Sequence, residues 1–243
     1  MMSYTNGFSA SRRRGTLRRW VMAGLHYVAR VAAAGQGRVW DPSPIPQHCD
    51  YSIRNANPAD YSLVGQLVVD VYGSLPGMPG VLEQPDYYGV LRDVAKRARN
   101  PVISVFVAAS KSEVLGSVDF IADMTQYGSG GAAGSITNAA GVRYLAVKPE
   151  FRGNGIGRSL TAYCVDRARE LGKSAVILHT TRPMATAWAM YSRMGFQRYA
   201  EIDFRQGTLD VFGFRLELEP RRSSMPVMTV PPSGSVNGSS HMA

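Results

Sequence analysis

Residues 142–160 read VRYLAVKPEFRGNGIGRSL, an apolar run followed by a turn with three glycines and the start of a stretch with helical spacing. Closely spaced glycines between a strand and a helix let successive backbone N–H groups converge, and the helix N-terminus adds partial positive charge. Arg152 and Arg158 add full charges. The segment therefore predicts a strand–turn–helix unit that binds a phosphate or a pyrophosphate.

The spacing of the glycines excludes two common classes of nucleotide site. A dinucleotide-binding turn needs its third glycine three residues after the second, and Arg158 occupies that place. A Walker-type loop needs Gly-Lys-Ser/Thr, which the segment lacks. The predicted phosphate site therefore fits a ligand other than those two classes of nucleotide.

Outward from this segment, hydrophobic periodicity predicts one domain over residues 51–219. Strands are expected at 52–56, 102–109, 114–122, 141–147, 175–181, 196–203 and 208–218, and helices at 60–72, 87–99, 157–171 and 185–194. Residues 126–138 are mostly Gly, Ala and Ser and are expected to form a flexible insertion. The fold class is α+β, with a mixed, mainly antiparallel central sheet flanked by helices.

Two segments flank this domain. Residues 1–50 form a basic, Pro-ended N-terminal extension that we expect to be flexible, with an organelle-targeting peptide and a basic surface anchor as open alternatives. Residues 220–243 are rich in Ser, Pro, Met and Gly without a period, which predicts a disordered C-terminal tail.

Composition limits the environment and the partners. The chain has 243 residues, 45% of them hydrophobic, and its two cysteines, Cys49 and Cys164, are far apart, so we expect a cytoplasmic protein without a disulfide framework. No stretch approaches the roughly 20 apolar residues that span a bilayer. The net charge of +9 comes partly from arginines at the start of the chain, which makes nucleic-acid binding by the domain a weaker alternative. A homodimer remains open.

The turn carries a family resemblance. Residues 152–157, Arg-Gly-Asn-Gly-Ile-Gly, match the Arg/Gln-x-x-Gly-x-Gly/Ala signature of the GCN5-related N-acetyltransferases (GNAT), and residues 145–151 and 191–196 resemble the family too. The similarity in element order covers residues 52–218. It implies the acyl-CoA N-acyltransferase fold, acetyl-CoA as co-substrate and no metal, with an amine of a small molecule or protein as acceptor. A non-catalytic coenzyme A binding or sensing module is the alternative.

The resemblance also implies where the cofactor binds. Residues 145–147 should separate from the neighbouring strand and pair with the pantetheine arm, the N–H group of Val147 should face the thioester oxygen, and the N–H groups of 153–158 should hold the pyrophosphate. The expected cofactor-binding residues are Leu145, Ala146, Val147, Arg152, Gly153, Asn154, Gly155, Ile156, Gly157, Arg158 and Ser159.

Tyr191 matches the tyrosine that this family uses to protonate or hydrogen-bond the coenzyme thiolate. The alternative is a packing role beside Trp188, which lies three residues earlier on the same helix face. A phenol is a plausible proton donor to a thiolate with a pKa of about 8.5.

The base is less well specified by the sequence. A lysine-like amine with a pKa near about 10.4 is almost fully protonated at pH 7, so a proton acceptor or relay is expected. Many relatives place Glu where this chain has Arg143, which cannot accept a proton. Glu201 and His179 are the leading catalytic candidates, and Asp119 and Asp203 remain open.

The acceptor pocket in such enzymes is built from the first two helices and their loop. We expect its residues to include Tyr72, Glu83, Tyr87 and Tyr88, with Met78 and Asp86 nearby. Aromatic rings beside carboxylates could bind a cationic amine. Packing of the loop is the alternative role of these side chains.

Overall fold

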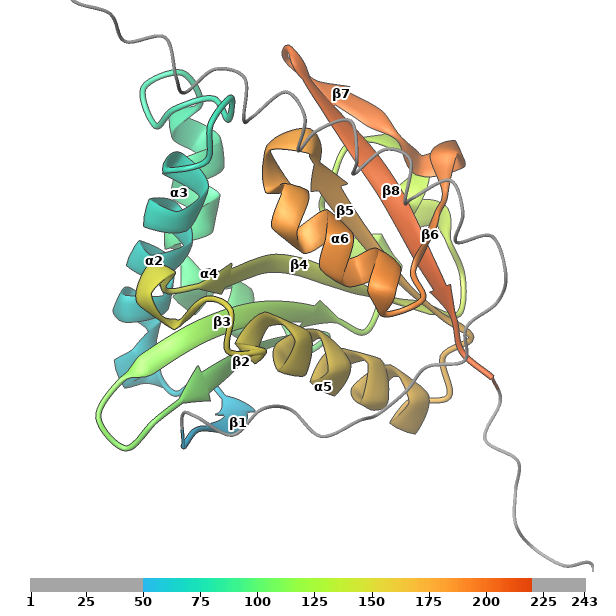
Figure 1. The fold of residues 1–243 in the computed structure, drawn as a ribbon. Coiled ribbons are helices and arrows are strands. Elements are labelled where there is room, and N and C mark those ends of the chain that lie inside the picture. Colours follow the sequence, from blue (N-terminus) through green and yellow to red (C-terminus); the bar gives the residue numbers. More distant parts are fainter. Residues whose placement is uncertain (1–49, 220–243) are drawn as a thin grey trace, which may run out of the picture.

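A computed structural model describes residues 50–219, so the predictions for residues 1–49 and 220–243 lie outside the described part of the chain. The core of the protein is one sheet, shown in Figure 1. Its strands are β1 (Ser52–Asn55), β2 (Ile103–Ala109), β3 (Val114–Ile121), β4 (Ala139–Val147), β5 (Ala175–Thr181), β6 (Gln197–Arg198), β7 (Phe204–Gln206) and β8 (Leu209–Glu217). They pair in the order β1-β2-β3-β4-β5-β8-β6, with β7 added to β8.

Helices cover both faces of the sheet (Figure 1). The helices are α2 (Tyr61–Gly73), α3 (Pro85–Arg92), α4 (Val94–Ala98), α5 (Ile156–Glu170) and α6 (Ala185–Arg193). Residues of α2, α3 and α4 pack against one face of β2, β3 and β4. On the other face, α5 packs against β2, β3 and β4, and α6 packs against β5. All strand pairs are antiparallel except β4–β5. The predicted α+β fold with a mixed, mainly antiparallel sheet is therefore confirmed.

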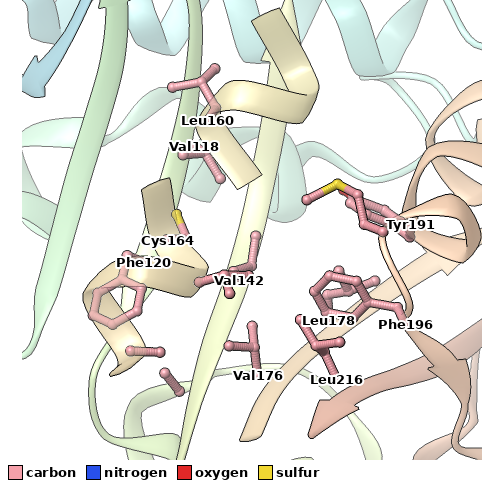
Figure 2. Packing of buried hydrophobic residues seen from close by; sticks show 14 of the residues in the cluster. Val118, Phe120, Val142, Leu160, Cys164, Val176, Leu178, Tyr191, Phe196 and Leu216 are labelled. Atoms are coloured by element: carbon pink, nitrogen blue, oxygen red, sulfur yellow. The ribbon is translucent and has the colours of Figure 1, made fainter. Parts of the chain in front are cut away.

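The buried face of α5 supplies much of the core. Ile156, Leu160, Cys164 and Ala168 are at most 1% exposed and lie in one cluster with residues of β3, β4 and β5. Figure 2 shows Leu160 and Cys164 on one side of β4, with Leu178 and Phe196 on the other. Leu171, the last residue of the helix expected over 157–171, is 41% exposed, because the helix ends at Glu170.

Two predicted elements are interrupted by aspartates. The helix expected over 87–99 is two helices, because the Asp93 carboxylate accepts from the Lys96 N–H at 3.0 Å and starts a new one. The strand expected over 196–203 pairs with β8 only at β6 and then forms a 3-10 turn (Ala200–Ile202). There the Asp203 carboxylate accepts from the Gly213 N–H at 2.7 Å.

The segment expected to be a flexible insertion packs onto the sheet. It contains 3-10 turns at Met124–Gln126 and Gly131–Ser135, and Tyr127 and Ala133 are buried. The Tyr127 ring lies directly on Gly141 of β4, where a Cβ atom would come within 2.4 Å of Tyr127 Cδ2. Tyr127 and Ala133 belong to a cluster with Ala139 and Ile177 of β4 and β5. The absence of a side chain at Gly141 thus fixes the position of Tyr127.

Among residues 50–219, none of the helices combines the length and the apolarity that crossing a bilayer requires. In the same range, His, Cys, Asp and Glu side chains do not gather in groups of three or more that could hold a metal ion.

Candidate functional site

Strands β4 and β5 separate in the middle of the sheet. They pair in parallel only from Ala139↔Ala175 to Val142↔Leu178. Beyond that point β5 stays paired with β8 as far as Thr181, and β4 stays paired with β3 as far as Val147. The second halves of the two strands therefore leave a gap between them.

A β-bulge in β4 accompanies the separation. Ser117 pairs with Ala146 and Asp119 with Arg143, so one residue of β3 opposes two residues of β4. Within the bulge Tyr144 has a φ of 53°. Such a bulge raises the local twist of the strand, which bends β4 away from β5.

The bulge leaves the backbone edge of Leu145 and Val147 open toward the gap. The Lys148 N–H donates to the Leu115 carbonyl of β3 at 2.9 Å, and backbone groups of an antiparallel strand alternate in direction. Val147 and Leu145 therefore face away from β3. The Val147 carbonyl accepts there from Arg152 Nε at 3.2 Å.

Ala146 is not placed as predicted for a cofactor-binding residue. It lies opposite Ser117, its backbone turns toward β3, and it is 1% exposed. Because neither its methyl group nor its peptide edge reaches the gap, the two residues beside it form the available edge.

The glycine turn ends where α5 begins. Gly153 and Gly155 have φ values of 86° and 77°, a region that favours glycine, and Gly155 is the N-cap of the helix. The Ser159 N–H donates to the Gly155 carbonyl at 2.9 Å. The N–H groups of Ile156 and Gly157 precede this bond and have no intrahelical acceptor, which makes the turn suited to an anion.

Not every residue predicted around the turn can contact a ligand through its side chain. Ile156 is 1% exposed, so only its backbone is available. Ser159 is buried, and its hydroxyl bonds to the Tyr51 hydroxyl at 2.8 Å and to the Gly155 carbonyl at 3.2 Å. The Ser159 hydroxyl is therefore engaged within the protein. Asn154 is half-buried and donates to the Phe151 carbonyl at 3.3 Å.

Gly157 links the turn to the open edge of β4. A Cβ atom at Gly157 would lie 3.6 Å from Met190 Sδ, 3.7 Å from Val147 Cγ2 and 3.8 Å from Leu145 Cδ2. Elements α5, α6 and β4 thus meet at this glycine. The missing side chain leaves room along the strand edge toward the turn.

A pocket lies beside the gap and takes residues from the α2–α3 side of the sheet. It is a cavity of about 70 Å³. Its walls come from α2, α3 and the loop between them, from the Tyr127 segment, from β4 and β5, from the 3-10 turn after β5, and from β7 and β8. The lining residues are Tyr72, Met78, Gln84, Tyr87, Tyr127, Ser129, Val142, Arg143, Tyr144, His179, Thr180, Thr181, Met184, Phe204, Gln206, Leu209 and Val211. Gln206 Nε2 of β7 donates to Gln84 Oε1 at 2.9 Å. This hydrogen bond connects the β7 wall to the wall formed by the loop before α3.

The acceptor-pocket predictions divide evenly. Tyr72 and Tyr87 line the pocket, whereas Glu83 and Tyr88 do not. Tyr88 is fully buried in the core, and its hydroxyl donates to the Pro79 carbonyl at 2.9 Å. The Glu83 carboxylate accepts from the Gly80 N–H at 2.6 Å and stabilises the loop. The predicted carboxylates beside the aromatic rings are therefore not part of the pocket wall.

His179 lies in the pocket wall as a neutral, fixed imidazole. Its Nε2 is 2.9 Å from the Ile202 carbonyl, so Nε2 carries the proton and Nδ1 accepts from the Tyr127 hydroxyl at 3.0 Å. Burial lowers the pKa of His179, and the guanidiniums of Arg143 and Arg198 lower it further. The Ile202 carbonyl and the Asp203 carboxylate raise it, but by less, so the pKa stays below its ordinary value. Burial raises the pKa of Tyr127, which keeps its proton.

The carboxylates considered as bases are engaged elsewhere. Glu201 is exposed on the 3-10 turn beside Tyr199 and does not line the pocket with His179. Asp119 is 2% exposed and pairs with Arg97 at 2.6 Å. Asp203 pairs with Arg198 at 2.6 Å. His179 is thus the one sequence candidate that the described part of the chain brings into the pocket.

Tyr191 projects from α6 toward the core beside the gap (Figure 2). It is 5% exposed, and its ring packs edge-on against Phe196 with centroids 5.7 Å apart. Burial raises the pKa of Tyr191, and the Tyr127 phenol and the Cys164 thiol raise it further. Within residues 50–219 its hydroxyl has no hydrogen-bond partner, so the phenol is a protonated and unengaged donor.

Sequence reasoning missed Tyr127, Tyr144 and Thr180. Tyr127 is a lone large side chain in a run of small residues, and this contrast was the signal available. Thr180 is 2% exposed, lines the pocket and has a hydroxyl without a partner in the described residues. Tyr144 stacks with Arg143 at 4.4 Å and with Arg97 at 4.9 Å, contacts that sequence alone does not show.

Known proteins resemble this chain in sequence. The sequence model of the Acetyltransferase (GNAT) family matches residues 70–196. Streptothricin acetyltransferase of Streptomyces lavendulae is 37% identical over 86 residues, which cover 31% of this chain and 46% of that protein. The chain spans between 20% and 46% of the length of the curated relatives it matches.

Solved structures share the fold. A GNAT acetyltransferase of Staphylococcus aureus Mu50 superposes with a TM-score of 0.55 at 16% identity, covering 70% of this chain and 100% of the other. The PaiA N-acetyltransferase of Thermoplasma acidophilum, solved in complex with coenzyme A, superposes with a TM-score of 0.52 at 16% identity, covering 68% and 98%.

The neutral state of His179 predicts a loss of stability in acid. The unfolded chain takes up a proton at His179 near pH 6.5, whereas the folded protein resists it, so the free energy of unfolding should fall as the pH drops below that value. Urea unfolding between about pH 7.5 and about pH 5.5 would measure the slope. We expect His179→Gln to be less stable at neutral pH but to lose less stability on acidification. Equal slopes in both proteins would contradict the assignment.

Proposed function

The chain belongs to the GNAT acetyltransferase family, and on that premise we propose that it transfers an acetyl group from acetyl-CoA to an amine that attacks the thioester directly in a ternary complex. The observation that carries the proposal is the gap between β4 and β5. It has an anion-binding turn at one end and the pocket of Tyr127 and His179 beside it. A cofactor and an acceptor entering from opposite sides would meet there.

The cofactor would lie along the open edge of β4. Pantetheine amides can pair with the backbone of Leu145 and Val147 as an added strand does. The pyrophosphate would bind at the N–H groups of Ile156 and Gly157, with Arg152 supplying charge. The Val147 N–H points into the gap and would donate to the oxyanion of the tetrahedral intermediate. All of these contacts except Arg152 use main-chain groups.

Three protons move in this reaction, and afterwards His179 releases a proton to solvent while Tyr191 regains one from it. The amine nitrogen bonds to the acetyl carbon, the C–S bond breaks, and the thiolate takes a proton from the Tyr191 hydroxyl. The amine loses a proton to the Tyr127 oxygen while the Tyr127 proton passes to Nδ1 of His179. This relay takes the place of the glutamate that Arg143 replaces. The neutral imidazole and the protonated phenols described above are the states that these steps require.

A non-catalytic coenzyme A binding module of the same fold is the second candidate. The observation that favours it is Arg143 at the position of the usual glutamate. Release of free thiol from acetyl-CoA in the presence of an amine separates the two candidates, because a sensing module binds the cofactor without turnover.

Gly155→Val should block the cofactor turn. A β-branched residue at a φ of 77° is strained by roughly 1 to 2 kcal/mol, and its side chain would crowd the phosphate position. We expect the affinity for acetyl-CoA, measured by calorimetry, to fall about tenfold or more. Gly172→Val is the matched control, because Gly172 has a φ of 67° at the other end of α5. Unchanged affinity in Gly155→Val would refute the site.

Tyr191→Phe should lower turnover without weakening cofactor binding. The ring and its packing against Phe196 remain, and only the proton donor is lost. We expect kcat to fall roughly a hundredfold or more, with acetyl-CoA affinity unchanged. Tyr163→Phe on α5, where the tyrosine is 40% exposed, is the control. Full activity of Tyr191→Phe would show that this tyrosine has only a packing role.

Tyr127→Phe tests the relay. The ring on Gly141 is kept, and the hydroxyl that joins the amine to His179 is removed. We expect kcat/KM to fall about tenfold or more and the acid limb that His179 contributes to its pH profile to disappear. His179→Gln should have a similar effect, and the double variant should be no worse than either single one. A pH profile that keeps this limb in both single variants would exclude the relay.

A further inference from the structure

The pocket wall carries an uncompensated positive charge. Among the described residues that line it, Arg143 alone is charged at neutral pH, since His179 is held neutral. The predicted acids Glu83 and Glu201 are not in the wall. A pocket of this charge is a poor place for a polycationic acceptor.

Arg143 is held with one edge of its guanidinium available. Its Nη1 donates to the Tyr127 carbonyl at 2.5 Å and to the Gly128 carbonyl at 2.6 Å. The guanidinium carbon lies 4.4 Å from the Tyr144 ring centroid and 5.3 Å from that of Tyr127. Within residues 50–219 its Nε and Nη2 have no hydrogen-bond partner. These two nitrogens form the edge with parallel N–H bonds that binds a carboxylate in bidentate fashion.

The nearby carboxylates do not cancel this charge. Asp119 is the cross-strand neighbour of Arg143, but it pairs with Arg97, so two guanidiniums share one carboxylate. Asp203 is engaged by Arg198 and by the Gly213 N–H. One positive charge therefore remains at the pocket.

A second group points to a polar ligand. The Thr180 hydroxyl is buried, lines the same pocket and has no partner in the described residues. A buried hydroxyl without a partner costs free energy that a hydrogen-bonding ligand recovers. Arg143 and Thr180 together supply hydrogen-bonding groups to the pocket.

From these contacts we infer that the acceptor is an amine that also carries a carboxylate, which Arg143 binds through Nε and Nη2. The inference rests on the proposed transferase function. The replacement of glutamate by Arg143 thereby changes the substrate class. A glutamate in the pocket would attract a cationic acceptor, whereas Arg143 attracts the carboxylate of the acceptor. The cavity of about 70 Å³ suits a small acceptor of this kind or the end of an acidic chain.

Matched acceptor pairs test the substrate class. Amino acids and their carboxamides, with spermidine as a cationic acceptor, would be compared by thiol release from acetyl-CoA. The carboxamides have the less basic amines and are more often neutral, so the comparison is biased against the expected result. We expect the intact protein to favour the carboxylate of the best pair by roughly ten- to a hundredfold in kcat/KM.

Variants assign the preference to Arg143. Arg143→Gln should abolish the preference, measured as the ratio of kcat/KM for the carboxylate to kcat/KM for its carboxamide, while leaving acetyl-CoA affinity within about twofold. Arg143→Glu should reverse it. Arg205→Gln is the control, because Arg205 lies on β7 beside the pocket-lining Phe204 and Gln206 but points outward, 70% exposed. It should retain the preference.

The outcomes separate the inference from the proposed function. Thiol release with carboxamides or spermidine at rates equal to or above those of the carboxylates would overturn the inference and leave the transferase intact. A preference that survives Arg143→Gln would also overturn it. Absence of thiol release with every acceptor, despite acetyl-CoA binding, would instead favour the sensing module and remove the premise.

Discussion

One extra residue in β4 relative to β3 determines the shape of the site. The bulge places Arg143 and Tyr144 consecutively on the α2–α4 side of the sheet and returns Leu145 and Val147 to the α5–α6 side. It also bends β4 away from β5, so a backbone edge that would be saturated in a regular sheet faces a gap. In a regular strand this edge would be hydrogen-bonded to β5. The turn before α5 would then lie beside a continuous sheet without a gap.

The strained residue of the bulge is supported by charged groups. Tyr144 is 7% exposed, and its ring contacts the guanidiniums of Arg97 and Arg143. Arg97 in turn pairs with the buried Asp119 and donates to the carbonyls of Val90 and Leu91, where α3 ends. Removing one partner of a buried pair leaves an uncompensated charge, typically at a cost of about 3 to 5 kcal/mol. This network therefore couples the position of α3 and α4 to the geometry of the bulge.

The segment between β3 and β4 converts the gap into a reaction site with two sides. In this segment the Tyr127 ring packs on Gly141, and the Tyr127 carbonyl accepts a hydrogen bond from Arg143. The Tyr127 hydroxyl donates to His179. On the other side, the main-chain edge of Leu145 and Val147 faces the gap, and the side chains of these two residues lie close to Gly157 of α5. Tyr191, a buried residue of α6, completes the arrangement between the two sides. The side that would bind the cofactor is mostly backbone, and the side that would bind the acceptor is mostly side chain.

The sequence by itself determined the features that depend on neighbours along the chain. The glycine turn, the buried stripe of α5, the strand–helix order and the family signature all follow from local periodicity and from φ values that favour glycine. Tertiary structure decided the rest, because those features depend on residues far apart in the sequence. It placed Glu201, Glu83 and Tyr88 outside the pocket wall, turned Ala146 toward β3, engaged the Ser159 hydroxyl with Tyr51, and packed the insertion against Gly141. It also brought Tyr127 to His179 across 52 positions of the chain, a contact that no local pattern encodes.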